Sequence, residues 1–164
     1  MESDDVRFLC DAMHGGLTRW LRAAGHDAAW RYGIDDKDLI AWARAEGRVI
    51  LTSDAPLMED QAIRQADPKA LFVPRGLQPT DALEFVLRAL ELPVKQPRCM
   101  PCGGSLVSVP KDSVASEAPP KTFAHVDAYF RCSRCGKLFW EGSHWRSIEE
   151  RLSSVKKKLE GPGP

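Results

Sequence analysis

Val6-Arg7-Phe8-Leu9-Cys10-Asp11 is a short apolar run that ends on an acidic residue. The segment that follows, residues 15–24, carries its apolar side chains at helical spacing, and Gly25 ends it. The chain therefore opens with a buried strand, an acid at the end of that strand, and a helix. This unit is typical of proteins in which strands alternate with helices.

The alternation continues to about residue 90. Further strands are expected over 28–31, 49–52 and 70–73, and further helices over 37–46, 56–65 and 79–90. Strands separated by helices pair in parallel, because each crossover returns the chain to the same end of the sheet. The sequence predicts an α/β fold with a parallel sheet flanked by helices.

Two cysteine pairs mark a second, smaller unit. Cys99-Met100-Pro101-Cys102 and Cys132-Ser133-Arg134-Cys135 have the Cys-x-x-Cys spacing that delivers two thiolates from one tight turn, and a glycine follows each pair. Two such turns supply the four thiolates of a structural Zn²⁺ site. We expect one zinc ion in a small zinc-ribbon domain.

The composition divides the chain at about the same place. Residues 1–95 carry 12 basic and 16 acidic side chains, whereas residues 96–164 carry 11 and 7. We therefore assign a sheet domain to 1–95, the zinc ribbon to 96–150 and a basic tail to 151–164. The tail starts as a candidate helix and is otherwise expected to be disordered. The excursion between the cysteine pairs, 107–121, is expected to be a surface loop.

The sequence also indicates the compartment. No apolar run approaches the roughly 20 residues that cross a bilayer, and the first residues are acidic where a secretory signal would be basic. We expect a cytoplasmic protein with no membrane partner. In that compartment Cys10, the fifth cysteine, is a buried apolar residue and not half of a disulfide.

Acidic residues recur at the ends of the predicted strands. Asp11 follows the first strand, Asp54 lies two residues beyond the strand 49–52, and Asp35-Asp36 stand at a helix start. The carboxyl ends of parallel strands share one edge, where open sheets bind their ligands. Carboxylates gathered there repel unless a divalent cation lies between them, and oxygen ligands favour Mg²⁺ or Mn²⁺. The reaction that such a site implies is metal-assisted hydrolysis of nucleic acid, although an aspartate after a strand is also a common helix cap.

Longer stretches carry a family resemblance. Phe8–Met13, Gly16–Arg22 and Gly25–Asp27 resemble the opening of the Mut-seven C-terminal RNase family, a branch of the PIN-like nucleases. Asp35–Leu39 and Ile50–Asp54 are similar to its later acidic segments. The family also carries a zinc ribbon of this type, matched by Tyr129–Cys132 and Trp140–Trp145, so the resemblance covers residues 7–146.

The resemblance implies a PIN-like ribonuclease with Asp11, Asp36 and Asp54 as catalytic, metal-binding carboxylates. Asp35 is the alternative to Asp36, and Glu59 or Asp60 is the candidate for a fourth acid. One or two Mg²⁺ or Mn²⁺ ions are compatible with this set. The sequence departs from the family pattern at His14 and Thr18, neither of which is a proposed ligand.

Candidate RNA-binding residues lie outside the acids. Arg19 and Arg22 share a helical face and are expected near the mouth of the site, where guanidinium groups bind phosphate. In the ribbon, His144 lies among aromatic and basic residues that stack bases and hold phosphates; these are Tyr129, Arg131, Arg134, Lys137, Trp140 and Trp145. For the two tryptophans we favour the alternative interpretation, that they fill the core of the ribbon.

Three function classes follow. The leading one is a metal-dependent ribonuclease with RNA as substrate; related folds also imply a homodimer or a protein inhibitor as partner. The second is a non-catalytic RNA- or ribosome-binding adaptor on the same fold. The third, a phosphoacceptor receiver using Asp54, is disfavoured because receivers carry an acidic pair after the first strand, and Ala12 follows Asp11 here.

Overall fold

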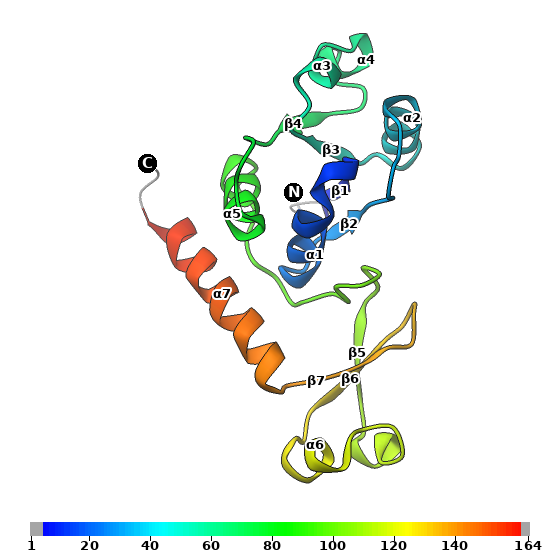
Figure 1. Ribbon diagram of the computed structural model, residues 1–164, viewed down its shortest axis with the longest axis vertical. Helices are drawn as coiled ribbons and strands as arrows, with labels where there is room; N and C mark the ends of the chain where they lie inside the picture. Colours follow the sequence, from blue (N-terminus) through cyan, green and yellow to red (C-terminus); the bar gives the residue numbers. More distant parts are fainter. Residues whose placement is uncertain (1–4, 162–164) are drawn as a thin grey trace.

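A computed structural model describes residues 5–161 and shows a four-stranded parallel sheet, as the sequence predicts (Figure 1). The strand order is β2-β1-β3-β4, and every neighbouring pair is parallel. The strands are β1 (Arg7–Cys10), β2 (Asp27–Ala29), β3 (Val49–Thr52) and β4 (Ala70–Phe72).

Helices cover both faces of this sheet. Phe8 and Cys10 point to one face and Leu9 to the other, because successive side chains of a strand alternate. The first face packs against α1 (Gly15–Ala23) and α5 (Pro79–Ala89); the second packs against α2 (Asp36–Glu46), α3 (Ala55–Met58) and α4 (Gln61–Arg64). A short 3₁₀ turn, η1 (Ala12–His14), joins β1 to α1.

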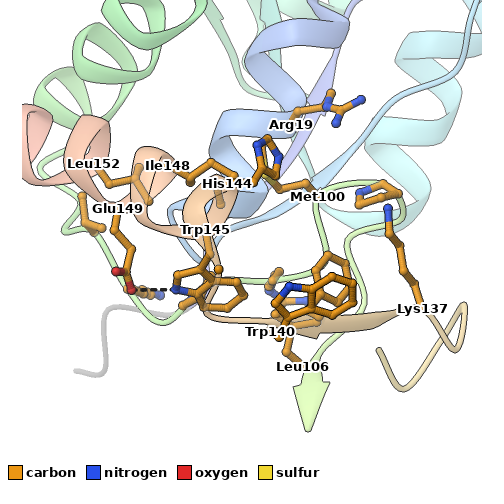
Figure 2. Close-up of a pocket in the computed structure, with 18 of the residues that line it drawn as sticks. Arg19, Met100, Leu106, Lys137, Trp140, His144, Trp145, Ile148, Glu149 and Leu152 are labelled. Carbon is orange, nitrogen blue, oxygen red and sulfur yellow. Dashed lines mark hydrogen bonds between the residues drawn. The ribbon is translucent and has the colours of Figure 1, made fainter. Parts of the chain in front are cut away.

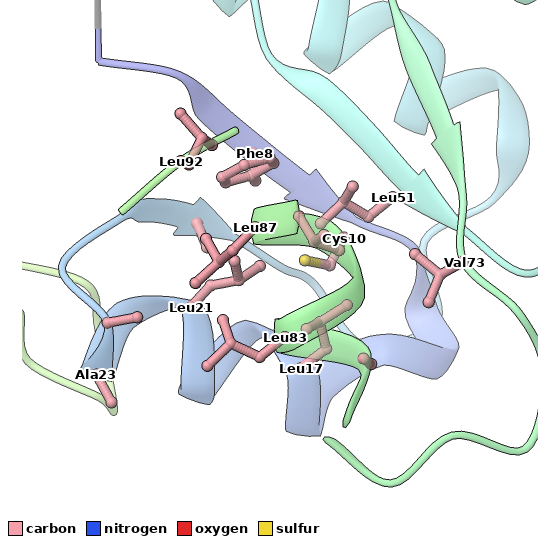
Figure 3. Packing of buried hydrophobic residues seen from close by; sticks show 14 of the residues in the cluster. Phe8, Cys10, Leu17, Leu21, Ala23, Leu51, Val73, Leu83, Leu87 and Leu92 are labelled. Atoms are coloured by element: carbon pink, nitrogen blue, oxygen red, sulfur yellow. The ribbon is translucent and has the colours of Figure 1, made fainter. Parts of the chain in front are cut away.

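The larger core lies between the sheet and α1 and α5 (Figure 3). Phe8, Leu21, Leu83 and Leu87 are fully buried in it. Cys10 is buried there too, and that burial raises the pKa of its thiol to about 12. The thiol is therefore protonated and unreactive, in agreement with the expectation that Cys10 is a small apolar residue.

The cysteine-containing segment forms a separate antiparallel sheet with the order β5-β6-β7. Its elements are β5 (Leu106–Val109), η2 (Lys111–Val114), α6 (Pro120–His125), β6 (Tyr129–Cys132) and β7 (Leu138–Trp140). The excursion predicted as a surface loop is instead partly helical, because Val114 and Ala118 are buried against Tyr129 in a small core of their own.

The prediction of a disordered tail from residue 151 is wrong for residues 151–160. These residues complete α7 (Ser143–Glu160), an 18-residue helix that lies beside α5 (Figure 1). Leu152 and Val155 are buried in the core of the sheet domain, with Ile148 and Leu159 packed against it. The helix thus returns the chain from the ribbon to the first domain, while residues 162–164 lie outside the described part.

The two units are joined by main-chain contacts as well as by α7. The amides of Lys95 and Arg98 donate to the carbonyls of Ala24 and Arg22, at 2.8 Å each. Gly25 has φ of +89°, and a Cβ there would lie 2.4 Å from the carbonyl oxygen of Gln96. Only glycine permits this approach, so the end of α1 is a docking point for the ribbon.

None of the helices within residues 5–161 has the length and apolar character needed to span a membrane.

The packing of α7 predicts a stability effect in the sheet domain. Leu152→Ala should lower the free energy of unfolding of the sheet domain by about 2–4 kcal/mol, because it empties a buried site. Urea denaturation followed by far-UV circular dichroism measures it. Ser154→Ala, on the exposed side of the same helix, is the matched control, and equal effects of the two variants would contradict this packing.

Candidate active site and cysteine cluster

Asp11 and Asp54 meet between β1 and β3, the two central strands, whose onward connections lead to opposite edges of the sheet. The connection after β1 leads outward to β2, whereas β3 lies on the other side of β1 and continues to β4. Neighbouring strands whose connections leave in opposite directions open a crevice at their carboxyl ends. Asp11 follows β1 and Asp54 follows β3, so both acids lie at this crevice.

Asp36 completes the group from the start of α2. Carboxylate oxygens of Asp11, Asp36 and Asp54 all lie within 4.8 Å of one another. Asp35 does not join them, because it caps α2 by accepting a 2.8 Å hydrogen bond from the amide of Asp38. The structure therefore selects Asp36 over Asp35.

No fourth acid joins this group among residues 5–161. Asp60 caps α4 by accepting from the amide of Ala62 at 2.8 Å. Glu59 lies just before it, at the end of α3.

Thr52 orders two of the three acids. Its hydroxyl donates to Oδ2 of Asp11 at 2.7 Å and accepts from the amide of Asp54 at 3.0 Å. Asp11 also accepts from the amide of Ala12, so both of its oxygens have partners. Asp54 makes no side-chain capping bond. Asp11 is thus a buried, fixed carboxylate, and the Asp54 carboxylate is the freer one.

The charges in the group act on each other. Desolvation, followed by the negative charges of Asp11 and Asp54, raises the pKa of Asp36 above its ordinary value. The neighbouring carboxylates thus add to the effect of desolvation on this pKa. Three oxygen ligands this close need only small side-chain rotations to share one hard cation, so the donor set fits Mg²⁺ or Mn²⁺.

The four paired cysteines converge as a second group. The sulfurs of Cys99 and Cys135 lie 3.7 Å apart, and those of Cys102 and Cys132 lie 3.4 Å apart. A tetrahedral Zn²⁺ with bonds of about 2.3 Å places its sulfurs about 3.8 Å apart, so these distances suit a zinc ion and exclude disulfides. The arrangement is compatible with a zinc ribbon.

Backbone groups prepare these sulfurs for a metal. The amides of Arg134 and Cys135 donate to Sγ of Cys132, and Gly104 donates to Cys102. Burial opposes ionisation of Cys132, yet the hydrogen bonds that it receives lower its pKa to about 6. These hydrogen bonds favour the thiolate form of Cys132, which is the form that binds a metal.

Comparison with known proteins identifies the family. The family model described as the Mut7-C RNAse domain matches residues 6–152, most of the chain. The chain belongs to the Mut7-C RNase domain family. Neither the comparison with curated proteins nor the comparison with solved structures gave a match.

Within this Mut7-C domain, Arg75 lies beside the acids and is not among the residues predicted from the sequence. Its Nε donates to the carbonyl of Ser53 at 2.9 Å, next to Asp54, while its side chain is exposed. No ion pair of Arg75 occurs within the described residues. Arg75 lies three residues after β4. The reasoning that placed the acids at the carboxyl ends of parallel strands therefore applies to Arg75 as well.

His14 lies behind the acids. Its Nε2 is 2.9 Å from Oγ of Ser53, whose only proton is donated to the carbonyl of Val73 at 2.6 Å. Nε2 of His14 must then carry the proton of their shared hydrogen bond. Desolvation lowers the pKa of His14, although the charge of Asp11 opposes the shift. His14 is thus a half-buried, hydrogen-bonded imidazole.

The predicted substrate-binding arginines lie elsewhere. Arg22 donates to the carbonyls of Ala28, Met100 and Pro101 at 2.8–3.0 Å, so its guanidinium holds the ribbon and is not free for phosphate. This corrects the expectation that Arg22 faces the mouth of the acidic site. Arg19 and His144 line a cavity beside the ribbon instead.

The other predicted RNA-binding residues of the ribbon form two groups: some have structural partners, and the others line the cavity. Tyr129 is 1% exposed and belongs to the ribbon core. Arg131 pairs with Glu117, and Arg134 donates to the carbonyl of Cys102. Trp140 packs against the ribbon core, as expected, whereas Trp145 is not part of that cluster. Both tryptophans line the cavity with Lys137 and His144.

The crowding at the cysteine cluster predicts a sensitive glycine. A Cβ on Gly104 would lie 2.6 Å from Sγ of Cys132, so Gly104→Ala should displace that ligand. We expect at least about 10-fold weaker zinc retention in a competition with a chromophoric chelator. Ser105→Ala, one residue further and exposed, is the control. Equal zinc retention in the two variants would count against a metal at this position.

The repulsion among the acids predicts a pH effect. An acid whose pKa is raised on folding loses stability as pH rises from its ordinary pKa through the raised value. Asp36→Asn should therefore stabilise the metal-free sheet domain near neutral pH and flatten this decline. Thermal unfolding across the acidic range, without added Mg²⁺ or Mn²⁺, measures it.

The control for this effect is Asp38→Asn, which removes an exposed acid of the same helix that pairs with Arg31 at 3.4 Å. It should give no such gain. A destabilising Asp36→Asn would show that the three carboxylates do not repel in solution.

Proposed function

We propose that this protein is a ribonuclease that uses Mg²⁺ or Mn²⁺ bound by Asp11, Asp36 and Asp54 to hydrolyse RNA. The observation that carries the proposal is the convergence of the three carboxylates at the switch point of the sheet, within 4.8 Å of one another. Membership of the Mut7-C RNase domain family supports the reaction class.

The three aspartates differ in burial, and we assign them different roles for that reason. Asp11 is 5% exposed and fixed by Thr52, so it sets the position of the site. Asp36 is exposed and Asp54 partly so, which leaves both accessible from solvent. A divalent ion held there would polarise the phosphodiester and lower the pKa of a bound water.

Arg75 supplies the positive charge beside these acids. The hydrogen bond to Ser53 uses its Nε, and the terminal nitrogens of the guanidinium have no partner within residues 5–161. A guanidinium in this position would hold a phosphate oxygen next to Asp54 and offset part of the charge that develops during hydrolysis.

Zinc has a structural part in this proposal. Four thiolates complete its coordination and leave no position for substrate, unlike a catalytic zinc site. The loop of the first cysteine pair receives the hydrogen bonds of Arg22, at Met100 and Pro101. Zinc would therefore hold the ribbon in register with the end of α1.

Asp54→Asn is the sharpest test, because the Asp54 side chain makes no capping bond whose loss would disturb the fold. Hydrolysis of a labelled RNA should depend on added Mg²⁺ or Mn²⁺ and fall by about 100-fold or more in the variant. Gel analysis of the products measures both effects. Asp38→Asn keeps the net charge of the variant and should cleave like the wild type.

Two outcomes would overturn the proposal. Full activity of Asp54→Asn would remove the acids from the reaction. RNA binding by the wild type without cleavage, together with no calorimetric signal on titration with Mn²⁺, would favour the non-catalytic adaptor.

A further inference from the structure

A cavity of about 620 Å³ lies where α1, the segment 94–101, β7 and the first half of α7 meet (Figure 2). None of the three site aspartates lines it. Its walls come from both domains, because Arg19 belongs to α1 and Trp140 to the ribbon. The docking of the two units therefore creates the cavity.

The floor of the cavity is aromatic, and its rings are held in place. Trp145 stacks on Phe130 with a centroid separation of 5.6 Å and an interplanar angle of 11°. Its indole nitrogen donates to Glu149 at 2.7 Å (Figure 2). Trp140 lies so close to Gly142 that a Cβ there would be 3.1 Å from the ring. Rings fixed in this way are ready to stack on a planar ligand.

Cations surround these rings. Arg19, Lys137 and Lys156 line the cavity, and within residues 5–161 none of them has a carboxylate partner. Lys137 lies over the ring of Phe139, 5.5 Å from its centroid. Glu149 is the single acidic residue of the lining, and it accepts the bond from Trp145. The cavity is thus positive as well as aromatic.

We propose that this cavity binds single-stranded RNA that flanks the cleaved bond, stacking its bases on the tryptophans and pairing its phosphates with Arg19, Lys137 and Lys156. The inference rests on the proposed function and names the form of its substrate. Bases and phosphates together use both features of the cavity, whereas an acidic peptide would use the cations alone.

The position of the cavity relative to the acids supports the binding of RNA that lies next to the cleaved bond. Arg19 lies eight residues after Asp11, in α1, and none of the three aspartates lines the cavity. RNA bound at both places would therefore have to extend from the acids to the cavity. RNA bound in the cavity would determine which phosphodiester bond of the same RNA chain lies at the three aspartates.

The test measures binding without cleavage. In an Asp54→Asn background with zinc retained and no added Mg²⁺ or Mn²⁺, fluorescence anisotropy reports the affinity for a labelled single-stranded RNA. The cavity variant combines Arg19→Gln, Lys137→Gln and Lys156→Gln. The control variant removes three exposed lysines outside the cavity, through Lys69→Gln, Lys121→Gln and Lys157→Gln.

The cavity variant should bind roughly 10-fold more weakly, and its slope of log affinity against log salt should be about 2 smaller, since each lost phosphate contact contributes about 0.7. The control should change affinity much less. Lys156 and Lys157 are neighbours on α7, so this comparison separates the cavity from general charge.

Equal weakening in the two variants, or equal affinity for single-stranded and duplex RNA, would overturn the cavity assignment. Failure of the nuclease proposal gives a different result. Selective loss of affinity in the cavity variant, with no cleavage by the wild type, would keep the cavity and reject the nuclease. Cleavage by the wild type with unchanged affinity in the cavity variant would reject the cavity alone.

Discussion

The pairing of β1 with β3 is the constraint on which the acidic site depends. The amide of Asp11 continues the strand ladder by donating to the carbonyl of Leu51 at 2.9 Å, which fixes where β1 ends relative to β3. Thr52 then joins Asp11 to the start of the next turn. A one-residue slip in this register would turn Thr52 to the opposite face and separate the acids.

Asp36 reaches the site from the other layer of the fold. Asp11 leads into α1, which covers one face of the sheet, whereas Asp36 begins α2, which covers the other. The site thus assembles only when both helical layers are docked. Burial of Leu39 and Ala43 against Leu9 and Ile50 provides that docking, so the hydrophobic core supports a group of charges that would otherwise separate.

Much of this arrangement is visible in the sequence, because it depends on local patterns. The four parallel strands and the meeting of Asp11 with Asp54 follow from alternation and strand ends. The choice between Asp35 and Asp36 does not, because both begin the same helix and only the capping bond to Asp38 separates them. The role of Arg22 also depends on a tertiary contact, the approach of Met100 and Pro101.

The C-terminal helix shows a different cause of error. Its lysines and the following glycines and prolines favour disorder, yet Ile148, Leu152, Val155 and Leu159 recur at intervals of four, three and four residues. That spacing forms one apolar stripe, and it was readable without the structure.

The packing of this stripe on the sheet domain also positions the other end of α7. The same helix that completes the core at Leu152 and Val155 carries Trp145 in its first turn, beside β7. Because a helix transmits position rigidly along its length, packing on α5 fixes the distance between the tryptophan and α1. The width of the cavity between the domains is therefore set by the core of the sheet domain as well as by the zinc ribbon.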